Sequence, residues 1–133
     1  MKKYTAFLLL FSMALGAFAQ TKPTPKKEQD YYEIKTLPIP KEIYLEVGGL
    51  ATMPDGRLAV STRRGEIWIV ENPYQKTSHQ TYYRRFASGL HEVLGLAYKD
   101  GAFYCSQRGE LTKISDTDRD GVADLYEPIY TFD

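Results

Sequence analysis

Hydrophobic and polar residues alternate over short stretches after residue 45, and turn signals separate these stretches. A two-residue period of this kind is typical of β-strands with one buried face. Asp55-Gly56 and Asp100-Gly101 each stand between apolar stretches, which is a strong signal for a hairpin. No helix is expected after residue 20, and one further strand is expected within Ile34–Val47. The pattern predicts eight more strands, near residues 49–53, 57–62, 66–70, 81–87, 94–98, 102–106, 110–115 and 127–132.

The predicted strands belong to an internal repeat. Glu46–Ala51 reads EVGGLA and Glu92–Ala97 reads EVLGLA, 46 residues apart. In each copy there follow an Asp-Gly turn, an apolar strand that ends in serine, an Arg-Gly-Glu turn and another strand. A period near 45 residues with several short strands is typical of a β-propeller blade. The predicted fold class is therefore all-β, with two consecutive four-stranded blades, about 46–90 and about 91–133, of an incomplete β-propeller.

The number of blades bears on whether the sequence can close a ring. A propeller usually needs about four to eight blades, and two alone would leave unpaired strand edges. We therefore expect the sequence to be the N-terminal part of a longer propeller. The alternative is a small β-protein that covers its edges by forming oligomers.

The first residues have the layout of an export signal. Lys2 and Lys3 precede an apolar stretch over Thr5–Leu15, and Ala17-Phe18-Ala19 has the A-x-A form of a cleavage site. We predict a signal peptide over 1–19, a flexible leader over 20–32 and the partial propeller over 33–133. The mature protein is expected to be secreted and to have no membrane span.

Composition narrows the functional classes. The 133 residues carry 17 Lys and Arg and 17 Asp and Glu, and removal of residues 1–19 leaves a net charge of −2. This balance argues against nucleic-acid binding, which normally needs a basic surface. Cys105 is the single cysteine, so neither an intrachain disulfide nor a CxxCH haem attachment can form within this sequence. We expect Cys105 to be a buried, inert thiol.

An acidic stretch near the end of the sequence fits a calcium loop. Residues 116–127 match D-x-D-x-D-G-x5-E, in which acidic side chains converge around a sharp turn at glycine. Pro128 breaks any exiting helix, so we expect the loop between two strands, with a structural role; Pro128 also counts against Glu127 as a ligand. The alternative is a solvated acidic turn. The predicted ligands are Asp116, Asp118, Asp120, the Val122 carbonyl, Asp124 and Glu127.

Other polar residues are expected at the opposite end of the blades. Strand-entrance loops and the turns between second and third strands emerge on one face of a propeller, which groups Glu46, His91 and Glu92 with Arg63, Arg64, Gln107 and Arg108. His91 is the candidate acid–base group, because His79 lies in a polar loop; the alternative is a hydrogen bond that anchors the loop. The three arginines are candidates for binding carboxylates or phosphates, or alternatively for ion pairs with Glu46, Glu66 or Glu92.

These motifs together resemble a known family. GGLATMPDGRLAVSTRRGEIWIVENP and RFASGLHEVLGLAYKDGAFYCSQRGELTKISDTDRDGVADLYE resemble the first blades of the glucose/sorbosone dehydrogenase-like β-propellers. These are similar to the quinoprotein sugar dehydrogenases that use pyrroloquinoline quinone (PQQ). The resemblance covers about residues 31–133. It implies a periplasmic six-bladed propeller with calcium, which oxidises a sugar or similar alcohol and is often followed by a cytochrome c or haem-binding module.

The resemblance also implies roles for individual residues. A channel histidine in the family takes a proton while hydride passes to the quinone, and His91 is at a plausible place for it. Arg63, Arg64 and Arg108 are the candidates for holding the cofactor, although most cofactor-binding arginines would lie in later blades. We do not expect the 133 residues alone to be active. Two alternatives are a non-catalytic, calcium-stabilised propeller that binds carbohydrate or protein, and a free-standing calcium-binding module.

Overall fold

The computed structural model describes residues 24–74 and 81–132, in two compact units that divide after Ile34. The first unit contains one 3-10 turn, η1 (Glu28–Asp30), so the expectation of no helix after residue 20 is wrong by this turn. Its cause is local, because the Asp30 carboxylate accepts a hydrogen bond from the Lys27 backbone N at 2.8 Å. The predicted signal peptide, residues 20–23 of the predicted leader and His79 lie outside the described residues.

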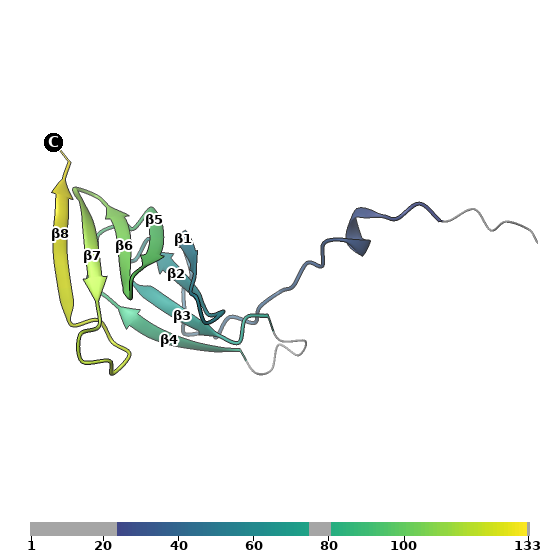
Figure 1. Ribbon diagram of the computed structural model, residues 1–133, viewed down its shortest axis with the longest axis horizontal. Helices are drawn as coiled ribbons and strands as arrows, with labels where there is room; N and C mark the ends of the chain where they lie inside the picture. The colour runs from purple at the N-terminus through teal and green to yellow at the C-terminus, as the bar shows by residue number, and fades with distance from the viewer. Residues whose placement is uncertain (1–23, 75–80, 133) are drawn as a thin grey trace, which may run out of the picture. The chain divides into compact units, whose positions relative to one another are not determined.

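The second unit is all-β and contains the eight strands predicted from the repeat (Figure 1). They form two antiparallel four-stranded sheets, each with its strands in chain order. Sheet one consists of β1 (Val47–Thr52), β2 (Leu58–Thr62), β3 (Ile67–Glu71) and β4 (Tyr82–Ala87). Sheet two consists of β5 (Gly95–Lys99), β6 (Ala102–Gln107), β7 (Glu110–Ser115) and β8 (Leu125–Thr131).

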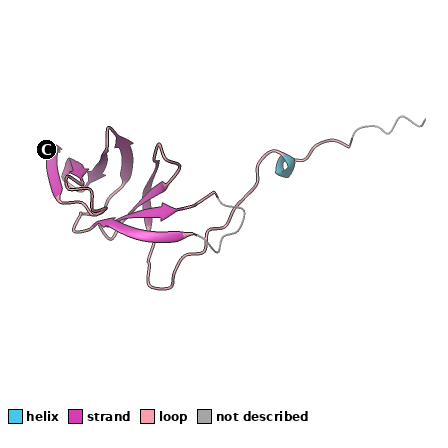
Figure 2. Cartoon of the chain, turned by 60° about the horizontal axis from the view of Figure 1, so that its bottom comes forward, coloured by secondary structure: helices cyan, strands magenta, loops and turns pink. Residues whose placement is uncertain are grey.

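The strand expected within Ile34–Val47 does not form. Residues 34–46 contain no strand, and β1 begins only at Val47. Pro38 and Pro40 lack the backbone N–H that a sheet ladder requires, which explains the difference. Figure 2 shows that strands make up nearly all the regular structure of the described residues, in which no helix is long and apolar enough to cross a membrane.

The internal repeat is preserved in the register of the strands. In sheet one, Leu50 and Ala51 pair with Val60 and Ala59. The equivalent Leu96 and Ala97 of sheet two pair with Cys105 and Tyr104. Equal register places repeat-equivalent side chains on equivalent faces of the two sheets.

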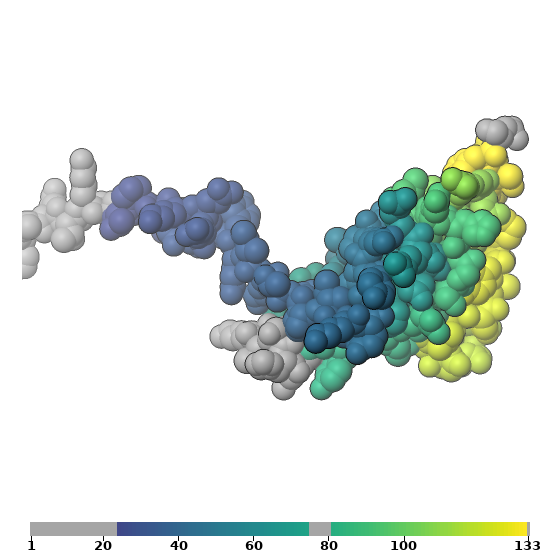
Figure 3. All heavy atoms as spheres, turned by 180° about the vertical axis from the view of Figure 1, so that it is seen from behind, coloured from purple at the N-terminus to yellow at the C-terminus, as the bar shows by residue number. Residues whose placement is uncertain are grey.

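The hydrophobic core lies between the sheets, which pack directly against each other (Figure 3). Each sheet has a forward face and a back face. The forward face of sheet one is the face that contacts sheet two. The forward face of sheet two is the repeat-equivalent face, so sheet two contacts sheet one through its back face. The forward face of sheet one contributes Ala51, Ala59, Ile67 and Ile69 to the core, and the back face of sheet two contributes Phe103, Cys105 and Ile114, together with Val93 just before β5.

Close contact between β1 and β5 depends on glycine. These two strands lie side by side where the sheets meet (Figure 1). A Cβ on Gly48 would lie 1.8 Å from the Val93 carbonyl O, and a Cβ on Gly49 would lie 2.6 Å from the Leu96 backbone N. No side chain fits at either position, so the glycines of the EVGGLA motif permit the two backbones to approach.

Candidate functional sites

The aspartate loop, predicted over residues 116–127, connects β7 to β8, but it ends at residue 124 because Leu125–Glu127 already belong to β8. Ligand oxygens of Asp116, Asp118 and Asp120 all lie within 4.8 Å of one another. Backbone N–H groups of the loop also donate to these carboxylates, with the Arg119 and Gly121 N atoms 2.7 and 2.8 Å from the two Asp116 oxygens. The loop therefore holds three converging carboxylates, the oxygen donors that hard divalent cations prefer.

The other predicted ligands are placed differently. Asp124 accepts hydrogen bonds from the Thr117 backbone N, at 2.8 Å, and from the Thr117 hydroxyl, and these bonds lower the pKa of the Asp124 carboxyl. Glu127 lies on β8 and forms an ion pair with Lys113 at 2.8 Å, which raises the pKa of the Lys113 ammonium. The Val122 backbone N donates to Asp120 at 2.7 Å. The three-carboxylate group includes neither Asp124 nor Glu127.

Although it belongs to sheet two, the aspartate loop is also bonded to sheet one. The Ala123 backbone N donates to the Phe86 carbonyl at 2.8 Å, and the Arg84 guanidinium donates to the Gly121 carbonyl. The loop returns to its own sheet through the Asp124 N, which donates to the Ser115 carbonyl at 3.1 Å. The conformation of residues 121–124 is thus coupled to the outer strand of the neighbouring sheet.

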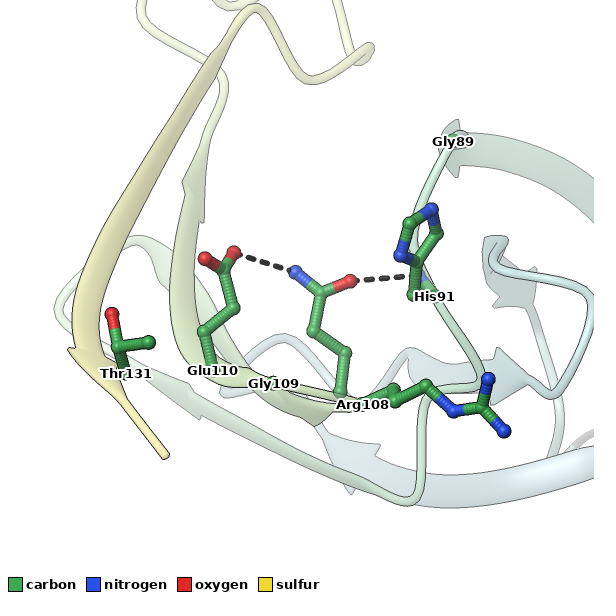
Figure 4. Close-up of a pocket in the computed structure, with 7 residues that line it drawn as sticks. Gly89, His91, Arg108, Gly109, Glu110 and Thr131 are labelled. Carbon is green, nitrogen blue, oxygen red and sulfur yellow. Dashed lines mark hydrogen bonds between the residues drawn. The ribbon is translucent and has the colours of Figure 1, made fainter. Parts of the chain in front are cut away.

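His91 lies at the other end of the sheets, beside the β6–β7 turn (Figure 4). Its backbone N donates to the Gln107 side-chain O at 2.7 Å, and its carbonyl accepts from the Arg108 N at 3.1 Å. Sheet one has a related contact, from the Arg63 N to the Glu46 carbonyl at 2.8 Å. The anchoring role considered for His91 is therefore present in its backbone, while its imidazole is exposed.

Two cavities are lined by His91. The smaller, of about 300 Å³, brings His91 together with Arg63 and Arg108, and is completed by Leu90 and Glu92. The larger, of about 450 Å³, is lined by Gly89, His91, Gln107, Arg108, Gly109, Glu110 and Thr131. Three of the four candidate catalytic and cofactor-binding residues thus share one cavity, although Arg63 follows β2 of sheet one, Arg108 follows β6 of sheet two and His91 lies between the sheets.

The fourth residue, Arg64, is held apart from this cavity. Its guanidinium lies 3.8 Å from the Glu46 carboxylate and 4.5 Å from the centre of the Tyr44 ring. Arg108 also forms an ion pair, with Glu92 at 3.3 Å. Two of the ion pairs considered as the alternative role of the arginines are therefore present.

A polar network beside His91 was not predicted from the sequence. The Gln107 amide donates to Glu110 at 2.9 Å and to Thr112 at 2.6 Å, and the Thr112 hydroxyl lies 2.6 Å from the same Glu110 oxygen. Thr112 is buried. Glu110 and Thr112 are two residues apart on a strand and so share a face, which is the signal that could have located them.

The thiol of Cys105 is buried, as predicted. Desolvation, with a smaller contribution from the Glu110 charge, raises the pKa of this thiol to about 11. A thiol in this state is a poor nucleophile at neutral pH.

No protein-family model, curated protein or solved structure matches this chain.

Proposed function

We propose that the two sheets are adjacent blades of an exported β-propeller, and that a calcium ion in the aspartate loop fastens the second blade to the first. The observation that supports this best is the position of the loop. It holds three convergent carboxylates, and its next residues bond to Arg84 and Phe86 of sheet one. An ion that fixed this loop would also fix the contact between the sheets.

The donor set fits calcium. Asp116, Asp118 and Asp120 would hold the ion, with the Val122 carbonyl as a further oxygen. Asp124 would contribute through a water, since its oxygens already accept from Thr117. Glu127 would have to leave Lys113 in order to bind, so a site without Glu127 is favoured. The role proposed for the ion is structural.

Thermal unfolding of the purified protein with calcium and with chelator tests this role. Saturating calcium, at about a hundred times the dissociation constant, should stabilise the fold by about 2.7 kcal/mol. Asp118→Asn should remove most of this increment, while Asp100→Asn, in the exposed β5–β6 turn, should retain it. An identical unfolding temperature with calcium and with chelator would contradict the proposal.

For the whole propeller we propose PQQ-dependent oxidation of a sugar or similar alcohol, with the cavity of Arg63, His91 and Arg108 as part of the cofactor end. Two guanidinium groups and an imidazole suit a quinone that carries carboxylates. When bound, the quinone would supply the hydride acceptor. Arg63 and Arg108 would hold carboxylates, and the exposed His91 would be the residue that accepts a proton.

Binding of PQQ to the purified protein tests the proposed cofactor site. It is measured by the quenching of Trp68 and tyrosine fluorescence. Arg63→Gln should weaken binding by roughly tenfold, the loss expected for one charge-assisted contact. Arg85→Gln is the matched control, because Arg85 pairs with Glu66, just before β3, and does not line the cavity. Equal binding by both variants would argue against the cofactor role.

The ion pairs favour a second candidate, a non-catalytic propeller that binds carbohydrate or protein. Arg64 and Arg108 are engaged by Glu46 and Glu92, which supports a role in holding the ends of the sheets. Reduction of a dye by sugars, with PQQ and calcium added to the closed propeller, separates the two candidates. Turnover supports the dehydrogenase; sugar binding without turnover supports the binding module.

A further inference from the structure

The repeat makes it possible to compare each exposed surface with a buried counterpart in the same molecule. Val93 of sheet two packs against sheet one and is 0% exposed, whereas the equivalent Val47 of sheet one is 52% exposed. Ala51 lies in the core between the sheets, whereas the equivalent Ala97 is exposed. The back face of sheet one is therefore exposed at β1, and the forward face of sheet two is exposed at β5.

The repeat-equivalent glycines Gly49 and Gly95 show the same difference between a covered and an exposed surface. Gly49 allows the backbone at Gly95–Leu96 to approach, because a Cβ there would lie 2.6 Å from the Leu96 N. Gly95 is the repeat equivalent of Gly49, and the nearest atom to a Cβ built on it is the Ser106 Cβ, at 3.9 Å. The space that sheet two fills at Gly49 is thus open at Gly95.

The exposed β1 segment on the back face of sheet one resembles the segment that packs against Gly48 and Gly49 within the chain. It is therefore a candidate to fill the open space at Gly95. Gly48 and Gly49 together receive the segment Val93–Leu96, which reads VLGL, and the repeat equivalent of this segment is Val47–Leu50, which reads VGGL. Leu50 is 56% exposed and lies in this equivalent segment. On the same back face Val60 and Val70 are already buried, so the uncovered part is centred on β1.

We propose that the forward face of β5, at Gly95 and Ala97, binds the β1 segment Val47–Leu50 of a second copy of this chain. The contact is head-to-tail, because it joins different surfaces of the two copies and repeats the contact of sheet one with sheet two. Such an interface closes into a ring when its rotation allows. With about four to eight blades in a ring, closure would take about two to four copies.

One difference between the repeats limits how closely the copies can approach. Leu94 of sheet two stands where sheet one has Gly48, and β1 has an irregular register at Gly48 that β5 lacks. Leu94 is 69% exposed. The intermolecular contact is therefore expected to begin at Gly95 and to be weaker than the contact within the chain. This inference rests on the blade geometry of the proposed function, and it requires neither calcium nor PQQ.

Sedimentation velocity of the purified protein over a wide range of concentrations tests the proposal. The wild-type protein should form oligomers as the concentration rises. Gly95→Val should weaken association by roughly tenfold or more, because the added methyl groups fill the space for the second backbone. Val47→Glu should do the same from the opposite surface. Gly109→Ala, at a glycine with nothing within 4 Å of a built Cβ, is the control and should associate like wild type.

A mixture of the two blocked variants distinguishes head-to-tail contact from other modes of association. Gly95→Val retains an intact β1, and Val47→Glu retains an intact β5, so the equimolar mixture should form a dimer at a concentration where each variant alone is monomeric. Circular dichroism of each variant checks that the fold is kept. A wild-type protein that is monomeric at every concentration, variants that associate like wild type, or a monomeric mixture of folded variants would overturn the proposal. Loss of calcium or PQQ binding with assembly intact would count against the proposed function alone.

Discussion

Sheets one and two share strand order and register but differ in which side chains occupy equivalent positions. The forward face of sheet one carries Ile67 and Ile69, both fully buried, and the register makes Leu111 and Lys113 their equivalents in sheet two. Lys113 is paired with Glu127 on the same face. The comparison teaches that the two copies of a repeat can share a backbone geometry while the polarity of their side chains depends on what covers each face.

The turns between second and third strands differ in the same way. Gly65 of sheet one has φ +82°, and a Cβ on it would lie 1.8 Å from the Leu90 carbonyl O. Gly109, its counterpart in the Arg-Gly-Glu repeat, has no atom within 4 Å of a built Cβ. The Gly65 carbonyl accepts a hydrogen bond at 3.0 Å from the Leu90 N, in the connection between the sheets, and the Gly109 carbonyl accepts one at 2.8 Å from the Phe132 N, after β8. The difference is therefore the close packing of the Leu90 backbone against Gly65, which has no counterpart at Gly109.

The largest effect is therefore expected when the two glycines are exchanged for alanine. Gly65→Ala should lower the free energy of unfolding by at least about 3 kcal/mol, because it combines a left-handed backbone with a backbone clash. Gly109→Ala should change it by less than about 1 kcal/mol. Urea denaturation of both variants measures the contrast, and equal losses would show that the two turns are equivalent in solution.

The next effect concerns the equivalent valines. Val93→Ala should cost about 2–3 kcal/mol, since it removes fully buried methyl groups from the core between the sheets. Val47→Ala should cost less than about 0.5 kcal/mol in the monomer, because its side chain is half exposed. The measurement is the unfolding midpoint at a concentration where the protein is monomeric. A large loss for Val47→Ala there would mean that this face is already covered within one chain.

A smaller effect is expected at the link from sheet one to the aspartate loop. Arg84→Ala removes the donor to the Gly121 carbonyl and an ion pair with Glu71 at 3.6 Å, and should cost about 1 kcal/mol. It should also weaken calcium binding, measured by calorimetry. Arg85→Ala, the adjacent residue on β4, is the control and should leave calcium affinity unchanged. Equal calcium affinity in both variants would show that calcium binding in the loop does not depend on its contact with sheet one.

The smallest effect is a pH dependence in the β1–β2 turn. The Arg57 side chain donates to the Asp55 carboxylate at 2.8 Å and lowers its pKa. A lowered pKa stabilises the folded state above the pKa of the unfolded chain, and this contribution disappears as the pH falls through the folded value. Because Asp55 is half exposed, solvent screening keeps the contribution under about 1 kcal/mol.

Arg57→Ala should raise the pKa of Asp55 toward its ordinary value, as followed by NMR titration of its carboxyl carbon. Lys99→Ala, in sheet two, is the control and should leave the Asp55 titration unchanged. An unaltered Asp55 titration in Arg57→Ala would indicate that another group holds the carboxylate ionised.

Much of the fold could be predicted because its signals are local. Asp55-Gly56 and Asp100-Gly101 mark tight turns, and the alternation between them fixes eight strands and their order. The strand expected within Ile34–Val47 was wrong because apolar residues there do not compensate for the missing N–H groups of two prolines. The convergence of Asp116, Asp118 and Asp120 was likewise predictable, since their spacing and Gly121 act within one loop.

What the sequence determined by itself is thus the repeat, its turns and the aspartate loop, all of which depend on neighbours within a few residues. Only the tertiary structure decided that Glu127 pairs with Lys113, that Gln107 joins Glu110 and Thr112, and that Gly49 meets Leu96 while Gly95 has only Ser106 of its own sheet nearby. These outcomes depend on which strand faces which, and two nearly identical segments acquire different environments because only one of them has a neighbouring sheet on that side.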